Sequence, residues 1–247
     1  MKHLRKITLL LAVFALLFSI SCGDDDAGPD LSEVEIAFDS SNPPVSPSII
    51  TTMTSSSDPN AQEVGSNLAT INAFTGWSAF FQQQQGATKT STPIGTCGGD
   101  AVVYTYSTDS GNGTYTISYQ ICDEGDVYSF QMFYSENGST PQLFIYAEQS
   151  KSGDQGYMNV YGSGLGFAET QPVIIYAWEK NADNSFTFTI TDSEESYLYT
   201  INVNEDNSGD LSYVIDGTLY YEATWNATGT AGTYTNHNSG ESGTWTS

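Results

Sequence analysis

The sequence predicts a mainly β protein: an antiparallel up-and-down meander of about eleven or twelve strands, preceded by one amphipathic helix. Tyr, Phe, Val, Ile and Thr alternate with polar residues from about residue 86 onward, and clusters of Gly, Asn, Asp and Ser separate the runs. No helical pattern lies between these runs, which excludes a βαβ fold. The pattern leaves open whether the meander closes into a barrel or forms a strongly curved sheet.

Residues 1–21 have the layout of a secretory signal peptide. A short basic region ends at Lys6, and an uncharged apolar run of 14 residues follows from Ile7 to Ile20. As a helix this run would measure about 21 Å, less than the roughly 30 Å hydrocarbon core of a bilayer. We therefore expect a cleaved leader here and not a transmembrane helix.

Small residues precede the first cysteine in the stretch SISC, residues 19–22. This stretch resembles the lipobox of bacterial lipoproteins, which implies that Cys22 is acylated and anchors the mature chain in a membrane. The following GDDD, residues 23–26, resembles the acidic tether that sends some Gram-negative lipoproteins to the cell surface. The resemblance thus implies an outer-membrane, surface-exposed location. An ordinary signal peptide with a chance cysteine, and a plain solvated linker, are the alternatives.

The mature chain carries a large excess of acid. Three of the six Lys and Arg residues lie in the leader, so Lys89, Lys151 and Lys180 stand against 29 Asp and Glu, a net charge of −26. Nucleic-acid binding needs a basic footprint, so we expect no nucleic-acid partner. Hydrophobic content of 38% with 16 Tyr, 12 Phe and 4 Trp is enough for a core. About 190 folded residues fit one domain.

The region before the strands is expected to hold a tether and a helix. Residues 22–57, rich in Ser, Thr, Pro and Asp, are expected to be the acylated cysteine and a flexible tether, with one early strand at 34–38. A single β-rich domain is expected over 58–247. Its helix spans residues 59–83, because Pro59 suits a first turn and apolar residues recur every three or four positions. The stripe expected to face the core is Val64, Leu68, Ile71, Phe74, Trp77 and Phe81.

Twelve runs have the alternation of strands. They are residues 101–107, 113–122, 126–135, 142–150, 155–162, 172–180, 185–192, 196–203, 209–216, 217–225, 231–237 and 242–246. The turns between them repeat similar sequences, such as KNADNS and NEDNSGD, without the strict period of a propeller. These repeats indicate a succession of hairpins.

Two cysteines remain after Cys22, and the first hairpin brings them together if it pairs Val102 with Ile117 and Tyr104 with Tyr115. This register places Cys97 and Cys122 opposite each other. In an oxidising compartment such a pair predicts a disulfide, which stabilises by about 3 kcal/mol on the chain-entropy model. Two buried free thiols are the alternative.

One loop resembles the first half of a calcium loop. Oxygen-bearing side chains recur at Asn204, Asp206, Ser208 and Asp210. Ile215 stands where a calcium loop has its final glutamate, and the loop joins two strands instead of two helices. A plain hairpin turn is the alternative, and calcium is the only cofactor that the sequence suggests.

Catalytic motifs are not evident. His237 is the only histidine of the mature chain, and we find no GxSxG, HExxH or Cys-rich metal spacing. Carboxylates are abundant, and a pair across a cleft would suit glycoside hydrolysis. The candidates are Glu148, Glu169, Glu179, Asp192, Glu194, Glu195 and Glu222. Because acidic residues are so common here, the sequence does not select a pair.

Strand tyrosines and tryptophans remain as the candidate ligand-binding residues, chiefly Tyr220, Tyr221, Trp225 and Trp178. Lining one face of a curved sheet, they would grip a glycan by stacking or a lipid by apolar contact. The leading hypothesis is a non-enzymatic surface lipoprotein that binds a glycan or another envelope protein. The alternatives are a lipid or lipoprotein carrier, similar in outline to half-barrel lipoprotein carriers, and a carboxylate-based glycoside hydrolase.

Overall fold

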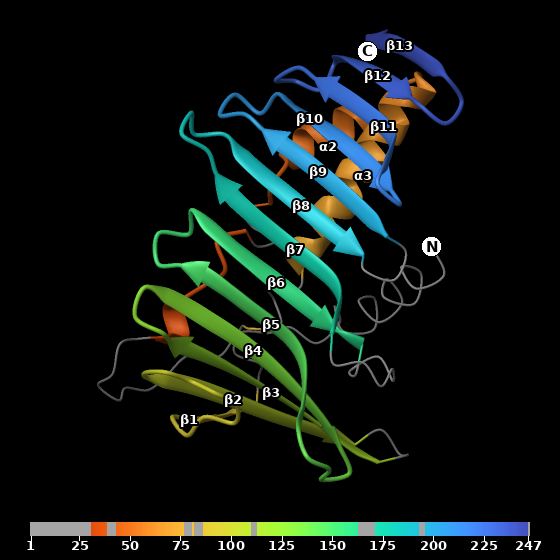
Figure 1. The fold of residues 1–247 in the computed structure, drawn as a ribbon. Helices are drawn as coiled ribbons and strands as arrows, with labels where there is room; N and C mark the ends of the chain where they lie inside the picture. Colours follow the sequence, from red (N-terminus) through yellow and green to blue (C-terminus); the bar gives the residue numbers. More distant parts are fainter. Residues whose placement is uncertain are drawn as a thin grey trace.

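A single open sheet makes up most of the protein. The computed structural model describes residues 31–38, 43–76, 81, 86–109, 113–162, 171–192 and 196–246, with the side chains of residues 74 and 75 left out. Thirteen strands lie side by side in chain order, each antiparallel to its neighbours, with β1 and β13 as the two edges. Figure 1 shows a strongly twisted sheet that does not close into a barrel. The meander expected from the sequence is therefore confirmed as an open curved sheet.

The strands match the twelve expected runs, with β1 added. Their bounds are β1 Thr88–Thr90, β2 Ala101–Asp109, β3 Thr114–Asp123, β4 Val127–Glu136, β5 Gln142–Ser150, β6 Gln155–Tyr161, β7 Pro172–Lys180, β8 Phe186–Asp192, β9 Tyr197–Val203, β10 Gly209–Ile215, β11 Thr218–Trp225, β12 Ala231–Asn236 and β13 Glu241–Thr246. The three residues of β1 are all exposed, so they lack the alternation that identifies the other strands.

Two α-helices precede the sheet, where the sequence predicted one. They are α2, Pro47–Thr54, and α3, Pro59–Thr75, and a short 3₁₀ helix η1 spans Leu31–Glu33. Asp58 caps α3 by accepting a hydrogen bond of 2.9 Å from the Asn60 N–H. The helix ends eight residues before its expected end, and Gly76, a poor helix former, follows it. Among the described residues, no helix combines the length and the apolar character needed to span a bilayer.

The expected apolar stripe of α3 faces the core. Val64, Leu68, Ile71 and Phe81 are buried, while Trp77 and the side chain of Phe74 lie outside the described residues. At the crossing of the two helices, a Cβ on Gly65 would stand 2.8 Å from the Met53 Cβ. A glycine that weakens α3 by itself thus allows α2 and α3 to touch.

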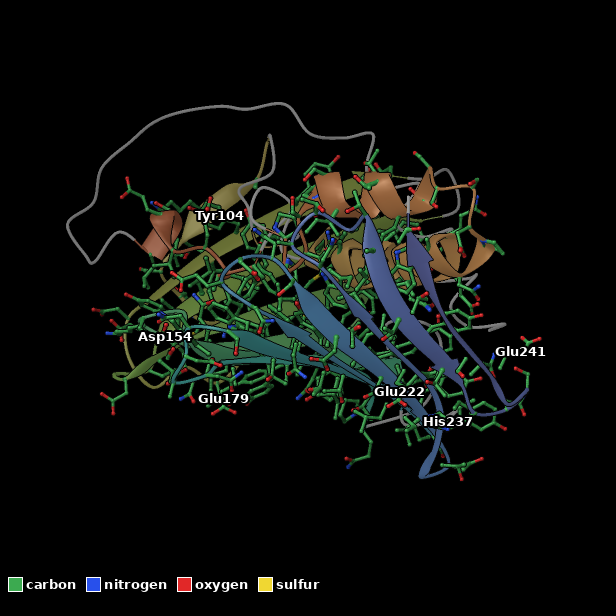
Figure 2. The ribbon with its side chains drawn as sticks, turned by 90° about the horizontal axis from the view of Figure 1, so that it is seen from above. Tyr104, Asp154, Glu179, Glu222, His237 and Glu241 are labelled. Atoms are coloured by element: carbon green, nitrogen blue, oxygen red, sulfur yellow. A yellow bond between two sulfur atoms is a disulfide. The ribbon has the colours of Figure 1, made fainter. Side chains whose placement is uncertain are left out.

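One face of the sheet, which we call the covered face, packs against residues 31–38 and 43–73. Its core residues include Tyr104, Phe130, Met158, Phe188 and Ile201. In Figure 2 the helices lie on one side of the sheet, with Tyr104 toward them and Glu179 and Glu222 on the other side. We call that other side the open face; from β8 to β13 it carries mainly Thr, Ser, Asn and acidic side chains.

The segment before α2 belongs to this cover. Gln149, on β5, accepts a hydrogen bond of 2.8 Å from the Ala37 N–H and donates one of 2.7 Å to the Glu35 carbonyl. Phe38 packs edge-on against Phe188, with ring centroids 4.8 Å apart. Residues 34–38 form no strand, and Leu31 is buried. The expectation of a flexible tether reaching residue 57 is therefore wrong for its described part, because this stretch buries the apolar surface of the sheet.

Three tryptophans cover glycines on the neighbouring strand. The pairs are Gly156 with Trp178, Gly209 with Trp225 and Gly232 with Trp245. In each pair, a Cβ built on the glycine would overlap the indole ring. The missing side chain makes room for the ring to lie flat over the backbone of the neighbouring strand.

Replacing Gly209 with alanine tests this contact. The added methyl would overlap the Trp225 ring and the Asn202 carbonyl, so we expect the free energy of unfolding to fall by about 1–3 kcal/mol in a urea titration. Gly76→Ala is the matched control, because a Cβ there meets no heavy atom within 4 Å. A loss at Gly209 no larger than at Gly76 would contradict the proposed role of the glycine.

Candidate functional site

Most of the aromatic residues expected to bind a ligand belong to the core. Trp178 and Trp225 are each 3% exposed and Tyr221 is 5% exposed, all on the covered face. The indole N–H of Trp178 donates to the Gly153 carbonyl at 3.1 Å, and that of Trp225 donates to the Asn207 carbonyl at 2.9 Å. The expectation of a surface role for these three is wrong, because strand alternation alone does not say which face is covered.

Tyr220 has a different position. It is half-buried at a bulge, where the pairing of β10 with β11 passes from Tyr213–Tyr221 to Val214–Leu219. Its ring centroid lies 6.4 Å from that of Tyr213, which stacks on Tyr199 at 4.4 Å. Tyr220 thus belongs to a tyrosine cluster with Tyr213 and Tyr199 and is more exposed than the other three candidates.

The loop expected to bind calcium closes a hairpin with its own side chains. The Asp206 carboxylate accepts hydrogen bonds from the N–H of Ser208 at 2.9 Å and its hydroxyl at 2.6 Å, and the Asn204 amide donates to the Ser208 hydroxyl at 2.9 Å. Asp210 lies on β10 and accepts from Asn202 at 2.8 Å.

The loop at residues 181–185 repeats this hydrogen-bond pattern with Asn181, Asp183 and Ser185. In both loops the residue before the serine, Asn184 or Asn207, has a positive φ. The shared N-x-D-N-S sequence is therefore explained by hairpin geometry, and calcium binding stays a prediction.

The carboxylate candidates for catalysis are scattered in the described structure. Glu222 lies 3.2 Å from His237 Nε2, and both side chains are exposed on the open face (Figure 2). Lys180, which follows Glu179 in the sequence, lies 3.6 Å from Asp154. Glu169, Glu194 and Glu195 lie outside the described residues. The Glu222–His237 contact is an exposed hydrogen bond and the Lys180–Asp154 contact is a surface ion pair, and such an exposed ion pair contributes little to stability.

The predicted disulfide joins Cys97 and Cys122, whose Cα atoms are 5.8 Å apart. The hairpin register behind the prediction was wrong: Val102 pairs with Ile121 and Tyr104 with Tyr119. A shift of four residues keeps every side chain on its face, so alternation cannot distinguish the two registers. Cys97 lies in the loop before β2 and not on a strand.

The disulfide fastens the loop of residues 91–100 over the open face at β3 and β4. The Gln120 side-chain carbonyl accepts from the N–H groups of Ile94 and Gly95 at 2.8 and 3.1 Å, and Gln131 donates to the Thr96 carbonyl at 2.8 Å. Gln120 is 0% exposed. These contacts hold residues 91–100, which we call the wall, against the open face at β3 and β4.

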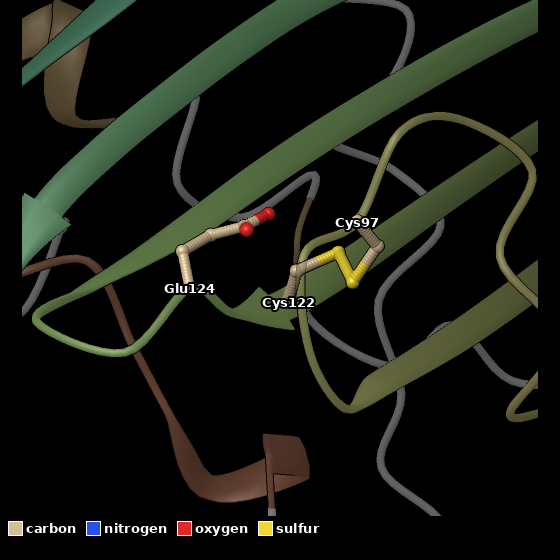
Figure 3. A group of neighbouring side chains, drawn as sticks. All are labelled: Cys97, Cys122 and Glu124. Carbon is tan, nitrogen blue, oxygen red and sulfur yellow. A yellow bond between two sulfur atoms is a disulfide. The ribbon is translucent and has the colours of Figure 1, made fainter.

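Figure 3 shows Glu124 close to the disulfide. Two cysteines and a glutamate within reach of one another resemble a metal-binding group. The two sulfur atoms are bonded to each other, and the Glu124 carboxylate accepts from the Gly98 N–H at 2.8 Å and the Ser129 hydroxyl at 3.1 Å. This group thus holds the wall in place.

Beside the wall lies a cluster that we call the open-face quartet: Tyr146 and Glu148 on β5, and Tyr157 and Asn159 on β6. The register places Tyr146 opposite Asn159 and Glu148 opposite Tyr157. The hydroxyls of Tyr146 and Tyr157 donate to Glu148 Oε2 at 3.0 and 3.5 Å. All four residues are half-buried, so the cluster reaches solvent.

Electrostatics keep the two phenols protonated. Burial, followed by the hydrogen bond to Glu148, raises the pKa of Tyr146, and burial followed by the charge of Glu148 raises that of Tyr157. The quartet therefore presents one carboxylate, two neutral phenols and one amide. Such a set accepts and donates hydrogen bonds beside apolar ring surface, which suits binding of a polar, hydroxyl-rich molecule.

Sequence reasoning considered Glu148 only as a catalytic acid and missed the quartet. The signal was present, because Tyr146 and Glu148, like Tyr157 and Asn159, are two residues apart and share a strand face. No protein-family model and no curated protein matches this sequence. The leader and the chemistry of the quartet are therefore the features that bear on function.

Replacing both Cys97 and Cys122 with serine tests the disulfide. Losing a bridge that closes a loop across a sequence separation of 25 should lower the free energy of unfolding by about 3 kcal/mol, measured by denaturant titration. As a control, iodoacetamide should label neither Cys97 nor Cys122 when the protein is unfolded in denaturant without a reductant, because Cys122 is buried in the folded protein. Labelling of both would show that the bond is absent.

Replacing Ser208 with alanine tests the closure of the hairpin loop. The hydroxyl of Ser208, followed by its N–H, lowers the pKa of Asp206, so its loss should raise that pKa toward its ordinary value, measured by carboxylate NMR titration. The contribution of this carboxylate to stability is present above its unfolded-state pKa and is lost as pH falls through its folded-state pKa. In the control Ser185→Ala, the pKa of Asp183 should rise while that of Asp206 stays unchanged.

Proposed function

We propose that the protein is a membrane-anchored cell-envelope lipoprotein that acts by binding an extracellular ligand on the open face of its sheet. The leader supports the anchor, because a basic region, a short apolar run, small residues and Cys22 occur in the order of a lipobox. Several acyl chains would hold the domain stably in a bilayer, which one chain alone would not.

The start of the packed domain limits the distance to the membrane. Leu31 is already buried, so residues 23–30 alone separate the domain from the proposed acylated cysteine. Fully extended, eight residues span about 28 Å at most. The domain would thus work close to the bilayer, and the acidic stretch 24–26 favours display on the outer surface of a Gram-negative outer membrane.

The open-face quartet is the observation that carries the binding role. Its phenol rings and carboxylate reach solvent next to the wall at residues 91–100, whereas the covered face is packed with side chains from residues 31–38 and 43–73. Binding sites combine apolar ring surface with a few convergent polar groups, as the quartet does.

A lipid carrier remains a second candidate because of one apolar groove. A hollow of about 410 Å³ lies on the surface of the helix pair, between α2 and α3, lined by Pro43, Pro47, Ile50, Ala69 and Ala73 among others. A half-barrel carrier would instead hold its ligand between helix and sheet. In the described residues that space contains core side chains such as Met53, Leu68 and Trp225. Retained lipid in native mass spectrometry of the purified protein would favour the carrier.

Replacing Cys22 with alanine tests the anchor. Without an acceptor thiol the protein should move from the membrane pellet to the soluble fraction after cell lysis, measured by immunoblotting. Ser21→Ala, which keeps a small residue before the cysteine, should stay in the pellet. Protease added to intact cells should degrade the wild-type protein if it faces outward. Membrane association of the Cys22→Ala variant equal to that of wild type would reject the lipid anchor.

A further inference from the structure

We propose that the open-face quartet binds an uncharged glycan chain, which stacks on Tyr146 and Tyr157 while Glu148 and Asn159 hydrogen-bond its hydroxyls. This proposal rests on the binding role proposed above and specifies its ligand.

The two phenol rings form the apolar part of the site. Their centroids are 6.0 Å apart with planes inclined by 34°, on a diagonal from β5 to β6. This separation is close to the length of one sugar ring, so adjacent sugars of a chain can each meet one phenol. The negative face of an aromatic ring attracts the polarised C–H groups of a sugar, while the phenol hydroxyls stay bound to Glu148.

Glu148 and Asn159 supply the polar part. An ionised carboxylate offers about four lone-pair sites, and both phenols donate to the same oxygen, Oε2. Oε1 is therefore the carboxylate oxygen placed to accept from a sugar hydroxyl. The Asn159 amide, opposite Tyr146 on β6, can donate to a ring or hydroxyl oxygen and accept from a second hydroxyl.

The neighbouring strands limit how a bound glycan chain can lie on the quartet. Gln131, the cross-strand neighbour of Tyr146 on β4, lies under the wall of residues 91–100. On the other side, β7 places Ala177 opposite Tyr157 and Ile175 opposite Asn159. Neither side chain carries a charge or a hydrogen-bonding group, so on this side the quartet meets apolar surface. A chain would thus lie against the wall and leave over β7.

Charge selects the class of glycan. The mature chain has a net charge of −26 and no arginine. Lys151 is paired with Asp123 at 2.8 Å and Lys180 with Asp154 at 3.6 Å, and Lys89 lies on β1, separated from β5 by β2, β3 and β4. An acidic sugar would bring its charge next to Glu148 with no cation to offset it. Hydroxyl-rich, uncharged sugars avoid this repulsion.

Affinity electrophoresis of the full-length lipoprotein in detergent micelles tests the proposal. Gels cast with a soluble neutral polysaccharide, such as a β-glucan, a galactomannan or dextran, are compared with gels holding polygalacturonate or chitosan oligomers. We expect retardation by at least one neutral polymer and none by polygalacturonate. Tyr157→Ala and Glu148→Gln should each weaken that binding by about tenfold. Tyr146→Phe, which keeps the ring, should lose less than Tyr146→Ala.

Two controls distinguish loss of the binding site from loss of folding. Tyr115→Ala removes a half-buried tyrosine of β3 that stacks on Tyr134, outside the quartet, and should bind like wild type. Melting temperatures of all variants establish that they fold. Binding of no neutral polymer, binding only of the acidic or cationic polymer, or equal binding by Tyr157→Ala overturns the glycan proposal. Because the assay uses micelles, its result is independent of the Cys22→Ala fractionation, so the anchor and the ligand are tested separately.

Discussion

Burial of the covered face is the interaction on which the rest of the structure depends. A thirteen-stranded meander has an apolar face too large to leave in water, and an open sheet cannot bury that face against itself as a barrel does. Residues 31–38 and 43–73, which precede the first strand, bury this face. Gln149 holds the segment around Glu35 by a hydrogen bond, and Gly65 lets α2 and α3 pack closely together over the later strands.

Repeated local contacts fix how the strands pair in the second half of the sheet. Tryptophan rings lie over glycines of the neighbouring strand, and two of these rings donate an indole hydrogen bond to the carbonyl of a positive-φ residue in a hairpin loop. The N-x-D-N-S loops set the hairpin geometry, and the Gly–Trp pairs help to fix the register. These local constraints tie each hairpin to its neighbour, which a long series of antiparallel strands needs to avoid slipping.

With one face committed to the core, the side chains of the other face are available for function. The disulfide and two glutamines hold a loop over β3 and β4, and the surface beside that loop carries two phenols, a carboxylate and an amide. The same tyrosine-rich composition therefore has two uses. Tyr104 and Tyr176 pack in the core, whereas Tyr146 and Tyr157 are half-exposed around Glu148.

The sequence by itself determined the leader resemblance and the all-antiparallel meander, because these follow from local composition and from alternation with a period of two. It also indicated the cysteine pairing, because Cys97 and Cys122 are the only cysteines after Cys22. Only the tertiary structure decided which face of the sheet is covered, and therefore that Trp178, Tyr221 and Trp225 are core residues while Glu148 belongs to a surface cluster. It also decided the register of the first hairpin and the role of residues 31–57. The physical reason is that alternation assigns residues to two faces without naming the buried one, and the choice depends on contacts between segments far apart in the chain.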